Sequence, residues 1–357
     1  MVLNIMIEHS NPTLGIKEKQ ALAKAIDQNY IAEGNQTHCF EKELSEYIGV
    51  KGGVATSTGT LGLHLALSAL DLKKNDEVII PSYTCRSVLN AVLYSGLTPV
   101  LCDVDIENYN ISFNEAKKVL SKNTKAIIIP HMFGCPVSLD KFKKLKVPII
   151  EDCAHSIGAK YKGQKVGSIG DLSLFSFEGT KYIVTGEGGM VLTGSNRLLK
   201  ILKKLKEPNS IDCLTKYTYR MSDLQATVGR VQLKRLEGFI RKRRSIAKIY
   251  DNAFKSCPVL LPKNQEYSRH IYQRYMIQIQ GNINTFIKIC LKKGIKVKQP
   301  VKPYALHKYL GLPSRDYPNT EHIMRSAVSI PIYPSLTNKQ VDFITRTIRR
   351  ILEDHAK

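Results

Sequence analysis

The sequence contains no C-x-x-C pair and no long apolar run, and each absence excludes a class of protein. Its eight cysteines are scattered through 357 residues, at positions 39, 85, 102, 135, 153, 213, 257 and 290. This spacing argues against a zinc site and is typical of reduced thiols in a cytosol. No apolar run approaches the length of a membrane span, and the opening residues MVLNIMIEHSNP lack the basic start and apolar stretch of a signal peptide. We therefore expect a cytoplasmic protein with no membrane segment and no metal site.

Acidic residues are few relative to basic ones, which leaves a formal charge of +22. Such an excess favours anionic partners, among them nucleic acids, membrane surfaces and phosphorylated small molecules. The densest basic piece is RKRRSIAK, residues 241–248, and the other basic residues are dispersed as on solvated helix faces. Because the sequence has neither an RNP motif nor zinc-finger spacing, we do not expect nucleic acid as a partner.

Apolar strand-like runs alternate with amphipathic helical patterns through the first two-thirds of the chain. The predicted strands are 76–81, 99–105, 124–130, 147–152 and 171–177, and the predicted helices are 16–31, 39–49, 59–70, 86–96, 112–120 and 138–146. Near-continuous apolar strands between such helices are typical of a mostly parallel sheet that is covered on both faces. The predicted fold class is therefore α/β.

A long helical pattern runs from Met221 to about residue 254 and would link two domains. Beyond it the sequence predicts a strand at 272–279 and helices at 284–294 and 338–355. We therefore predict a large α/β domain over residues 1–235 and a smaller C-terminal α+β domain over residues 236–357.

Lys181 stands between an apolar run and a glycine cluster in FSFEGTKYIVTGEGGM, residues 175–190. An arbitrary lysine at the end of a strand usually points into water. A lysine that forms a Schiff base instead needs a partly desolvated pocket. The flanking residues Phe177, Tyr182, Ile183 and Val184 would suit buried strands, and the rest of the chain must decide between the two readings.

Two polar pieces follow strands or open helices, where open α/β sheets bind ligands. In TSTGTLGLHLAL, residues 56–67, Thr58, Gly59 and Thr60 precede a helix, so backbone N–H groups and hydroxyls could hold a phosphate. A plain N-cap by Thr58 or Thr60 explains the same residues. In VPIIEDCAHSIGA, residues 147–159, Asp152 ends a strand and His155 follows. A carboxylate there needs either a cation or several N–H donors.

Two further pieces lie later in the chain. GDLSLFSFEGTK, residues 170–181, places Ser176 on the same strand and turn as Lys181, although its hydroxyl could simply bond to the sheet backbone. KYTYRMSDLQATVG, residues 216–229, leads into the long helix, with Ser222 as a plausible N-cap.

Taken in order, these pieces resemble the pyridoxal-phosphate-dependent sugar aminotransferases of the DegT/DnrJ/EryC1/StrS family, a branch of the fold-type-I aminotransferases. The resemblance covers nearly the whole chain. It is carried by STGTLGLHLAL, DEVIIPSYT, EDCAHSIGAKYKGQKVGSIGDLSLFSFEGTK, TGEGGMV, YRMSDLQATVGRVQL and SIPIYPSLT.

The resemblance implies a role for each matching residue. Lys181 would carry pyridoxal 5′-phosphate (PLP) as a Schiff base, Asp152 would pair with the pyridinium nitrogen, and His155 would lie near the ring hydroxyl. The phosphate would be held by Gly59, Thr60 and Ser176. An apolar pocket would lower the pKa of Lys181 and so favour the neutral amine.

The sequence departs from the family at three positions. Family members are homodimers with shared sites, and an asparagine before the long helix reaches the partner's phosphate; here Thr218 takes its place. Cys85 stands where many members stack an aromatic ring on the cofactor, and Glu178 stands where a ring is common. Glu178 would face the substrate, so substrate preference could differ.

The resemblance implies transamination in two halves. Glutamate would convert PLP to pyridoxamine phosphate, which would then aminate a keto group of a nucleotide-linked keto-deoxy sugar for polysaccharide synthesis. Arg220 and His307 are further candidates for substrate contacts. Two alternatives stay open: amination of a cyclitol or other cyclic ketone without a nucleotide, and a catalytically silent PLP-binding regulator. Relatives that dehydrate sugars replace the lysine by histidine, which Lys181 argues against.

Overall fold

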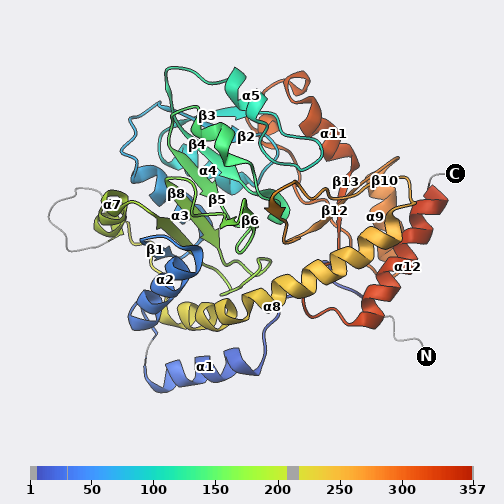
Figure 1. The fold of residues 1–357 in the computed structure, drawn as a ribbon, viewed down its shortest axis with the longest axis horizontal. Helices are drawn as coiled ribbons and strands as arrows, with labels where there is room; N and C mark the ends of the chain where they lie inside the picture. The colour runs from blue at the N-terminus through green and yellow to red at the C-terminus, as the bar shows by residue number, and fades with distance from the viewer. Residues whose placement is uncertain (1–5, 30, 207–216, 356–357) are drawn as a thin grey trace.

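A seven-stranded sheet forms the centre of the larger part of the molecule (Figure 1). The structure is a computed structural model and describes residues 6–29, 31–206 and 217–355. Neighbouring strands follow the order β1 (Gly52–Thr56), β9 (Gly189–Thr193), β8 (Leu172–Ser176), β5 (Ile149–Asp152), β4 (Thr124–Pro130), β2 (Glu77–Pro81) and β3 (Thr98–Cys102). Strands β8, β5, β4, β2 and β3 are parallel, and β9 is antiparallel to both of its neighbours. The predicted mostly parallel sheet is confirmed.

Both faces of this sheet are covered, which explains the continuous apolar runs. Along β2, Val78 and Ile80 pack into one core cluster, while Ile79 between them packs into another on the opposite face. Since side chains alternate across a strand, a strand buried on both faces must be apolar at every position. The covering helices are α2 (Asn35–Ile48), α3 (Gly59–Ser68), α4 (Arg86–Tyr94), α5 (Phe113–Lys118), α6 (Leu139–Lys143) and α7 (Asn196–Lys206). Helix α1 (Ile16–Asp27) packs against the long helix α8 (Asp223–Phe254) instead.

Helix α8 (Asp223–Phe254) runs from the large sheet to a second, smaller assembly (Figure 1). It begins at the expected N-cap, since Ser222 and Gln225 form a capping box. The smaller assembly contains a sheet with the order β10 (Val259–Leu260), β12 (Tyr275–Ile279) and β13 (Ala327–Ile330). Helices α9 (Ile283–Lys292) and α12 (Asn338–His355) flank it. The remaining elements are β6 (Lys160–Tyr161), β7 (Gln164–Lys165), β11 (Ser268–Arg269), α10 (Leu306–Tyr309), α11 (Pro318–Ser326) and the 3₁₀ helices η1 (Met132–Gly134) and η2 (Ser314–Asp316).

The two assemblies exchange short segments. Near the start of the chain, Ile7 bridges to Ile295 and packs in the C-terminal core. Strand β11 pairs with β6 of the larger part. The division at residue 235 stays a prediction, and α8 runs through that position without a break.

Two features of the structure concern membrane crossing and the cysteines. In the described part of the chain, no helix combines the length and apolarity that crossing a membrane requires. Seven cysteines are free thiols, and Cys213 lies outside the described residues.

Candidate active site

A cavity of about 350 Å³ opens where several sheet strands end. Its walls come from the turn before α3, the segment between β2 and α4, and the ends of β5 and β8. Eight of the residues predicted from the sequence line it: Gly59, Thr60, Cys85, Asp152, His155, Ser176, Glu178 and Lys181. These residues are up to 122 positions apart in the sequence, and the sheet brings them to one place.

Lys181 lies in a tight turn after β8 and faces this cavity. Its N–H donates to the Glu178 carbonyl at 2.9 Å, and its neighbours Phe177 and Tyr182 are buried. Burial lowers the pKa of the Lys181 amine, while the nearby Cys85, Asp152 and Glu178 oppose the shift. The lysine therefore does not point into bulk solvent. The residues from Tyr182 to Val184 are buried as predicted, but they form a loop and not the expected strand.

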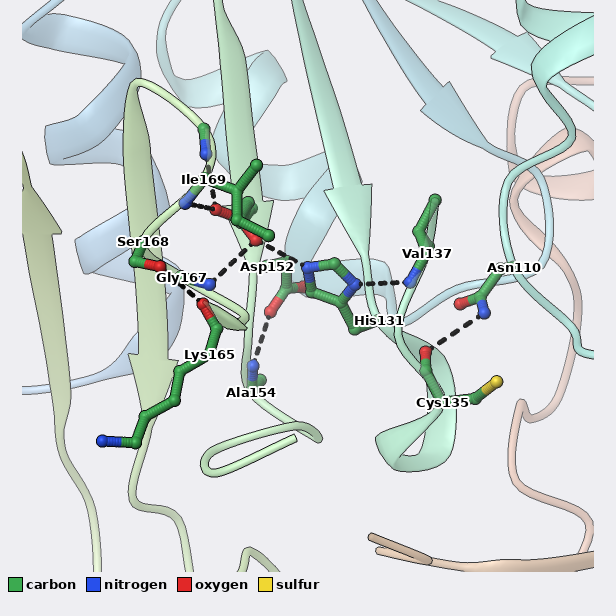
Figure 2. A network of polar contacts seen from close by, with 12 residues as sticks. Asn110, His131, Cys135, Val137, Asp152, Ala154, Lys165, Gly167, Ser168 and Ile169 are labelled. Atoms are coloured by element: carbon green, nitrogen blue, oxygen red, sulfur yellow. Dashed lines mark hydrogen bonds and ion pairs between the residues drawn. The ribbon is translucent and has the colours of Figure 1, made fainter. Parts of the chain in front are cut away.

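Asp152, at the end of β5, is a buried carboxylate with little help from the protein. Oδ1 accepts one hydrogen bond, from the Ala154 N–H at 3.0 Å (Figure 2). Burial raises the pKa of Asp152, although the Ala154 N–H, Lys181 and His131 act against the shift. A cationic group in the cavity would supply the missing partner and stabilise the ionised form.

The adjacent Glu151 has four hydrogen-bond partners, and it was not among the residues predicted from the sequence. Its carboxylate contacts His131 Nε2 at 2.9 Å and accepts hydrogen bonds from the N–H groups of Gly167, Ile169 and Gly170. Burial opposes ionisation, but these donors lower the pKa of Glu151. The clue in the sequence was a second acid directly before Asp152 in a buried strand.

His131 shows how this network borders the cavity. The Val137 N–H donates to His131 Nδ1 at 2.9 Å, so Nε2 carries the proton and donates it to Glu151. Cys153 lies close enough to form a potential metal-binding trio with these two side chains. Because Glu151 already accepts from four donors, no coordination position is open on it.

Helix α3 directs its N-terminus at the cavity. The Thr58 hydroxyl caps the helix by accepting from the Leu61 N–H at 3.3 Å, so the predicted N-cap is real. This leaves the first-turn N–H groups of Gly59 and Thr60 for a ligand. Ser176 lies beside them, because a Cβ added to Gly59 would lie 3.1 Å from Ser176 Oγ. The cap and the anion site therefore coexist.

His155 and Cys85 lie on the cavity wall. The ring of Phe133 stacks on His155 at 5.8 Å between centroids and 15° between planes. Burial, together with Lys181 and Arg274, lowers the pKa of His155, so its ring is neutral. Cys85 is exposed, and its thiol lies 3.4 Å from the Ser87 hydroxyl.

Glu178 is held in place within the same turn as Lys181. Its Oε2 accepts from the Thr180 N–H at 3.1 Å and from the Thr180 hydroxyl at 2.6 Å. The carboxylate therefore has a fixed position on the wall of the cavity.

Three predicted residues lie outside the cavity. Thr218 is exposed between Tyr217 and Tyr219, whose rings stack at 4.9 Å. Arg220 contacts Glu33 at 3.6 Å in a different surface pocket.

The substrate-contact prediction for His307 needs correction. Its side chain is fully buried, with Nδ1 2.7 Å from the Ser82 hydroxyl and Nε2 2.8 Å from Glu321. With both ring nitrogens engaged, His307 connects α10, α11 and the end of β2, and it has no free atom for a substrate.

The cavity thus has chemically distinct ends. A cation would stabilise the Asp152 carboxylate at one end, and the N-terminus of α3 with Ser176 would stabilise an anion at the other. Between them, Lys181 offers a nucleophilic amine. This arrangement suits a flat ligand that carries a protonated nitrogen, an anionic group and a carbonyl.

Known proteins resemble the chain over nearly its full length. The family model for the DegT/DnrJ/EryC1/StrS aminotransferase family matches residues 12–349. GDP-perosamine synthase from Escherichia coli O157:H7 is 32% identical over 96% of this chain and 98% of its own, and the spore coat polysaccharide biosynthesis protein SpsC from Bacillus subtilis is 30% identical over 98% of each. The PLP form of a putative sugar aminotransferase from Streptococcus pneumoniae superimposes with a TM-score of 0.92, at 25% identity, over 98% of this chain and 99% of its own. The chain therefore belongs to the DegT/DnrJ/EryC1/StrS aminotransferase family.

Proposed function

We propose that this protein binds PLP on Lys181 and transfers the amino group of glutamate to a keto group of a nucleotide-linked keto-deoxy sugar. One observation carries the proposal: a desolvated lysine, a buried carboxylate without a full set of donors and an open helix N-terminus face the same cavity. Each group lacks the partner that PLP would supply.

The residues present fit this cofactor at both ends. Asp152 would hold the protonated pyridine nitrogen and gain the cation that the protein does not provide. Gly59, Thr60 and Ser176 would hold the phosphate through N–H and hydroxyl donors. When bound, PLP supplies an electron sink for the electron pair that remains when a proton leaves the donor carbon.

Lys181 is the residue placed to move protons. Because burial lowers its pKa, the Nζ is more readily neutral, and a neutral amine can accept a proton and return it. His155 would lie near the ring hydroxyl and, being neutral, would add no charge there. Glu178 would face the incoming substrate.

The substrate class is inferred from relatives. The names of the E. coli and B. subtilis proteins refer to a GDP-linked amino sugar and to polysaccharide biosynthesis. A nucleotide diphosphate sugar is a polyanion, and the charge of +22 would increase its rate of encounter. We infer a role in making precursors of surface polysaccharide, in the cytoplasm, where both glutamate and nucleotide sugars are found.

We further propose a homodimer with shared active sites. Thr218 is exposed and outside its own chain's cavity, which is compatible with contact to the partner's phosphate. Arg220 stays a candidate for an anion or interface contact.

The decisive experiment follows the colour of the cofactor. Wild-type protein with PLP is expected to gain a visible absorption band, and glutamate should convert it to the near-ultraviolet band of pyridoxamine phosphate. Lys181→Ala should show neither change, whereas a surface control, Lys162→Ala, should behave as wild type because Lys162 is exposed and pairs with Asp140. A wild-type protein that ignores PLP would refute the proposal. A panel of nucleotide keto-sugars and a cyclitol ketone would then identify the acceptor.

A further inference from the structure

The loop between β2 and α4 forms one wall of the active-site cavity. Together with the first turn of α4, it supplies four of the lining residues, namely Thr84, Cys85, Ser87 and Val88. The loop begins at Ser82, whose hydroxyl lies 2.7 Å from His307 Nδ1. Both side chains are fully buried, so water does not compete for this contact. His307 is therefore joined to the cavity wall through Ser82, although it does not itself line the cavity.

Glu321 fixes the orientation of the His307 ring. Its Oε1 lies 2.8 Å from His307 Nε2, accepts from the Ser314 hydroxyl at 3.0 Å and pairs with Lys308 at 3.2 Å. Burial opposes ionisation, but these contacts lower the pKa of Glu321. An ionised carboxylate can only accept a hydrogen bond. In the neutral imidazole, Nε2 therefore carries the proton, and Nδ1 accepts from the Ser82 hydroxyl.

Two further contacts join α10 to the same loop. The Leu306 N–H donates to the Ser82 carbonyl at 2.9 Å. At the other end of the loop, the Arg86 guanidinium lies 4.6 Å from the centre of the Tyr309 ring. Helix α10 therefore contacts both ends of the loop, and His307 provides the side-chain contact that is shielded from solvent.

Ser82, His307 and Glu321 have the order of a hydrolytic triad, in which an imidazole links a hydroxyl to a carboxylate. A nucleophile must be accessible to its substrate, however, and Ser82 is completely buried. Tyr317 also stacks on the His307 ring, at 4.8 Å between centroids and 17° between planes, which packs the imidazole in place. These groups are therefore suited to holding the loop and not to hydrolysis.

We propose that His307 is a positioning residue for the cofactor: by accepting from Ser82, it fixes the β2–α4 loop so that Cys85 stays on the wall of the cavity. This inference rests on the proposed PLP-dependent function and goes beyond it, because it names a residue that acts on cofactor binding without touching the cofactor. The contact with Glu321 orients the ring, and the contact with Ser82 holds the loop.

Two substitutions of His307 separate its two contacts. Asparagine places an amide oxygen near the position of Nδ1 and can still accept from Ser82, whereas glutamine places its amide near Nε2 and reaches only Glu321. We expect His307→Gln to raise the Kd for PLP about 10-fold, because the buried Ser82 hydroxyl loses its acceptor. His307→Asn should stay close to wild type. Ser82→Ala should match His307→Gln, and combining the two should cause no further loss.

A second measurement follows the loop without the cofactor. Among the described cysteines, Cys85 alone is exposed, and Cys39 on α2 is half-buried and serves as the internal reference. Alkylation by iodoacetamide, mapped by peptide mass spectrometry, should be at least about 3-fold faster at Cys85 in His307→Gln and in Ser82→Ala, because the released loop opens more often. The rate at Cys39 should not change. His322→Gln is the matched control, since His322 is an exposed histidine next to Glu321 on α11.

Wild-type values of both measurements in His307→Gln and Ser82→Ala would overturn the inference. Equal losses of PLP affinity in His307→Gln and His307→Asn would also overturn it, because the contact with Ser82 would then not be the cause. Equally faster alkylation of Cys85 and Cys39, with a lower melting temperature, would assign His307 to the fold as a whole. If His307→Gln did not fold, Ser82→Ala would decide, since it removes a single hydroxyl. A wild-type protein that binds no PLP would refute the proposed function, whereas the alkylation of Cys85 would still show whether His307 holds the loop.

Discussion

Glu151 and Asp152 are neighbours on β5, yet the protein treats their carboxylates in opposite ways. Glu151 accepts from His131, Gly167, Ile169 and Gly170, whereas within the described residues Asp152 accepts only from Ala154. Because side chains alternate across a strand, one acid points into a prepared polar network and the other into the cavity. The pKa of Glu151 is lowered and that of Asp152 is raised. Glu151 therefore stabilises the fold, and Asp152 is free to bind a cationic ligand.

Asp152→Asn is expected to stabilise the apoprotein at neutral pH. A carboxyl whose pKa is raised by folding is easiest to bury when it is protonated. Its contribution to folding stability is therefore greatest below its unfolded pKa and is lost as pH rises through the folded pKa. The melting temperature of the variant should therefore exceed that of wild type at pH 7, and the difference should shrink towards pH 4. Adding PLP should reverse the order at pH 7, because only Asp152 can pair with the cofactor's cation. If the melting temperatures of the two apoproteins differed by the same amount at every pH, the raised pKa would not be the cause.

The same substitution should slow the glutamate half-reaction. Loss of a preorganised charge at the reacting group typically costs about 10²–10³-fold in rate. Stopped-flow absorbance of the PLP-loaded protein would measure the effect, and a wild-type rate would exclude a role for Asp152 in the chemistry.

Glu151→Gln should destabilise the fold without the same dependence on the cofactor. An amide would place an N–H₂ group among N–H donors, so we expect a loss of about 3 kcal/mol in the free energy of unfolding. Since the folded pKa of Glu151 is lowered, its contribution is present above the unfolded pKa and is lost as pH falls through the folded value. Urea unfolding at pH 7 and pH 4 would measure this. Glu353→Gln is the control, because Glu353 is an exposed residue of α12, and this variant should change the free energy of unfolding little.

Gly59→Ala should weaken PLP binding and leave the fold intact. The added methyl group would lie 3.0 Å from Ser176 Cβ and 3.1 Å from its hydroxyl, which crowds the phosphate site. We expect the Kd for PLP to rise about 10-fold, the equivalent of one lost hydrogen bond. Fluorescence or absorbance titration would measure it. Gly194→Ala is the matched control, because a Cβ there meets no atom within 4 Å; equal effects in both variants would exclude a specific role for Gly59.

Thr218→Asn should tighten PLP binding if the active sites are shared between protomers. The longer amide reaches further than the hydroxyl, and one additional hydrogen bond corresponds to about 2–10-fold in Kd. Thr218→Val should shift the Kd in the opposite direction. Light scattering should report a dimer for all three proteins. A monomer that binds PLP with unchanged affinity in both variants would rule out the shared site.

Much of the fold could be predicted from local pattern. Strand β4 has the predicted bounds, and α8 begins at the predicted cap because Ser222 and Gln225 form a purely local motif. Helix α7 and strands β1 and β9 were missed. The basic repeat LKKLK made α7 read as a solvated surface segment, although its leucines are buried. Strand β9 pairs with β1, which lies far away in the sequence, so no local pattern marked it.

Residue types and order by themselves determined the covered parallel sheet, the long connecting helix and the set of chemically suitable side chains around Lys181. Only the tertiary structure decided which of those side chains share a cavity, because hydrogen bonding and burial depend on contacts between distant segments. His307 illustrates this: its sequence context suited a substrate loop, but packing buried it between Ser82 and Glu321.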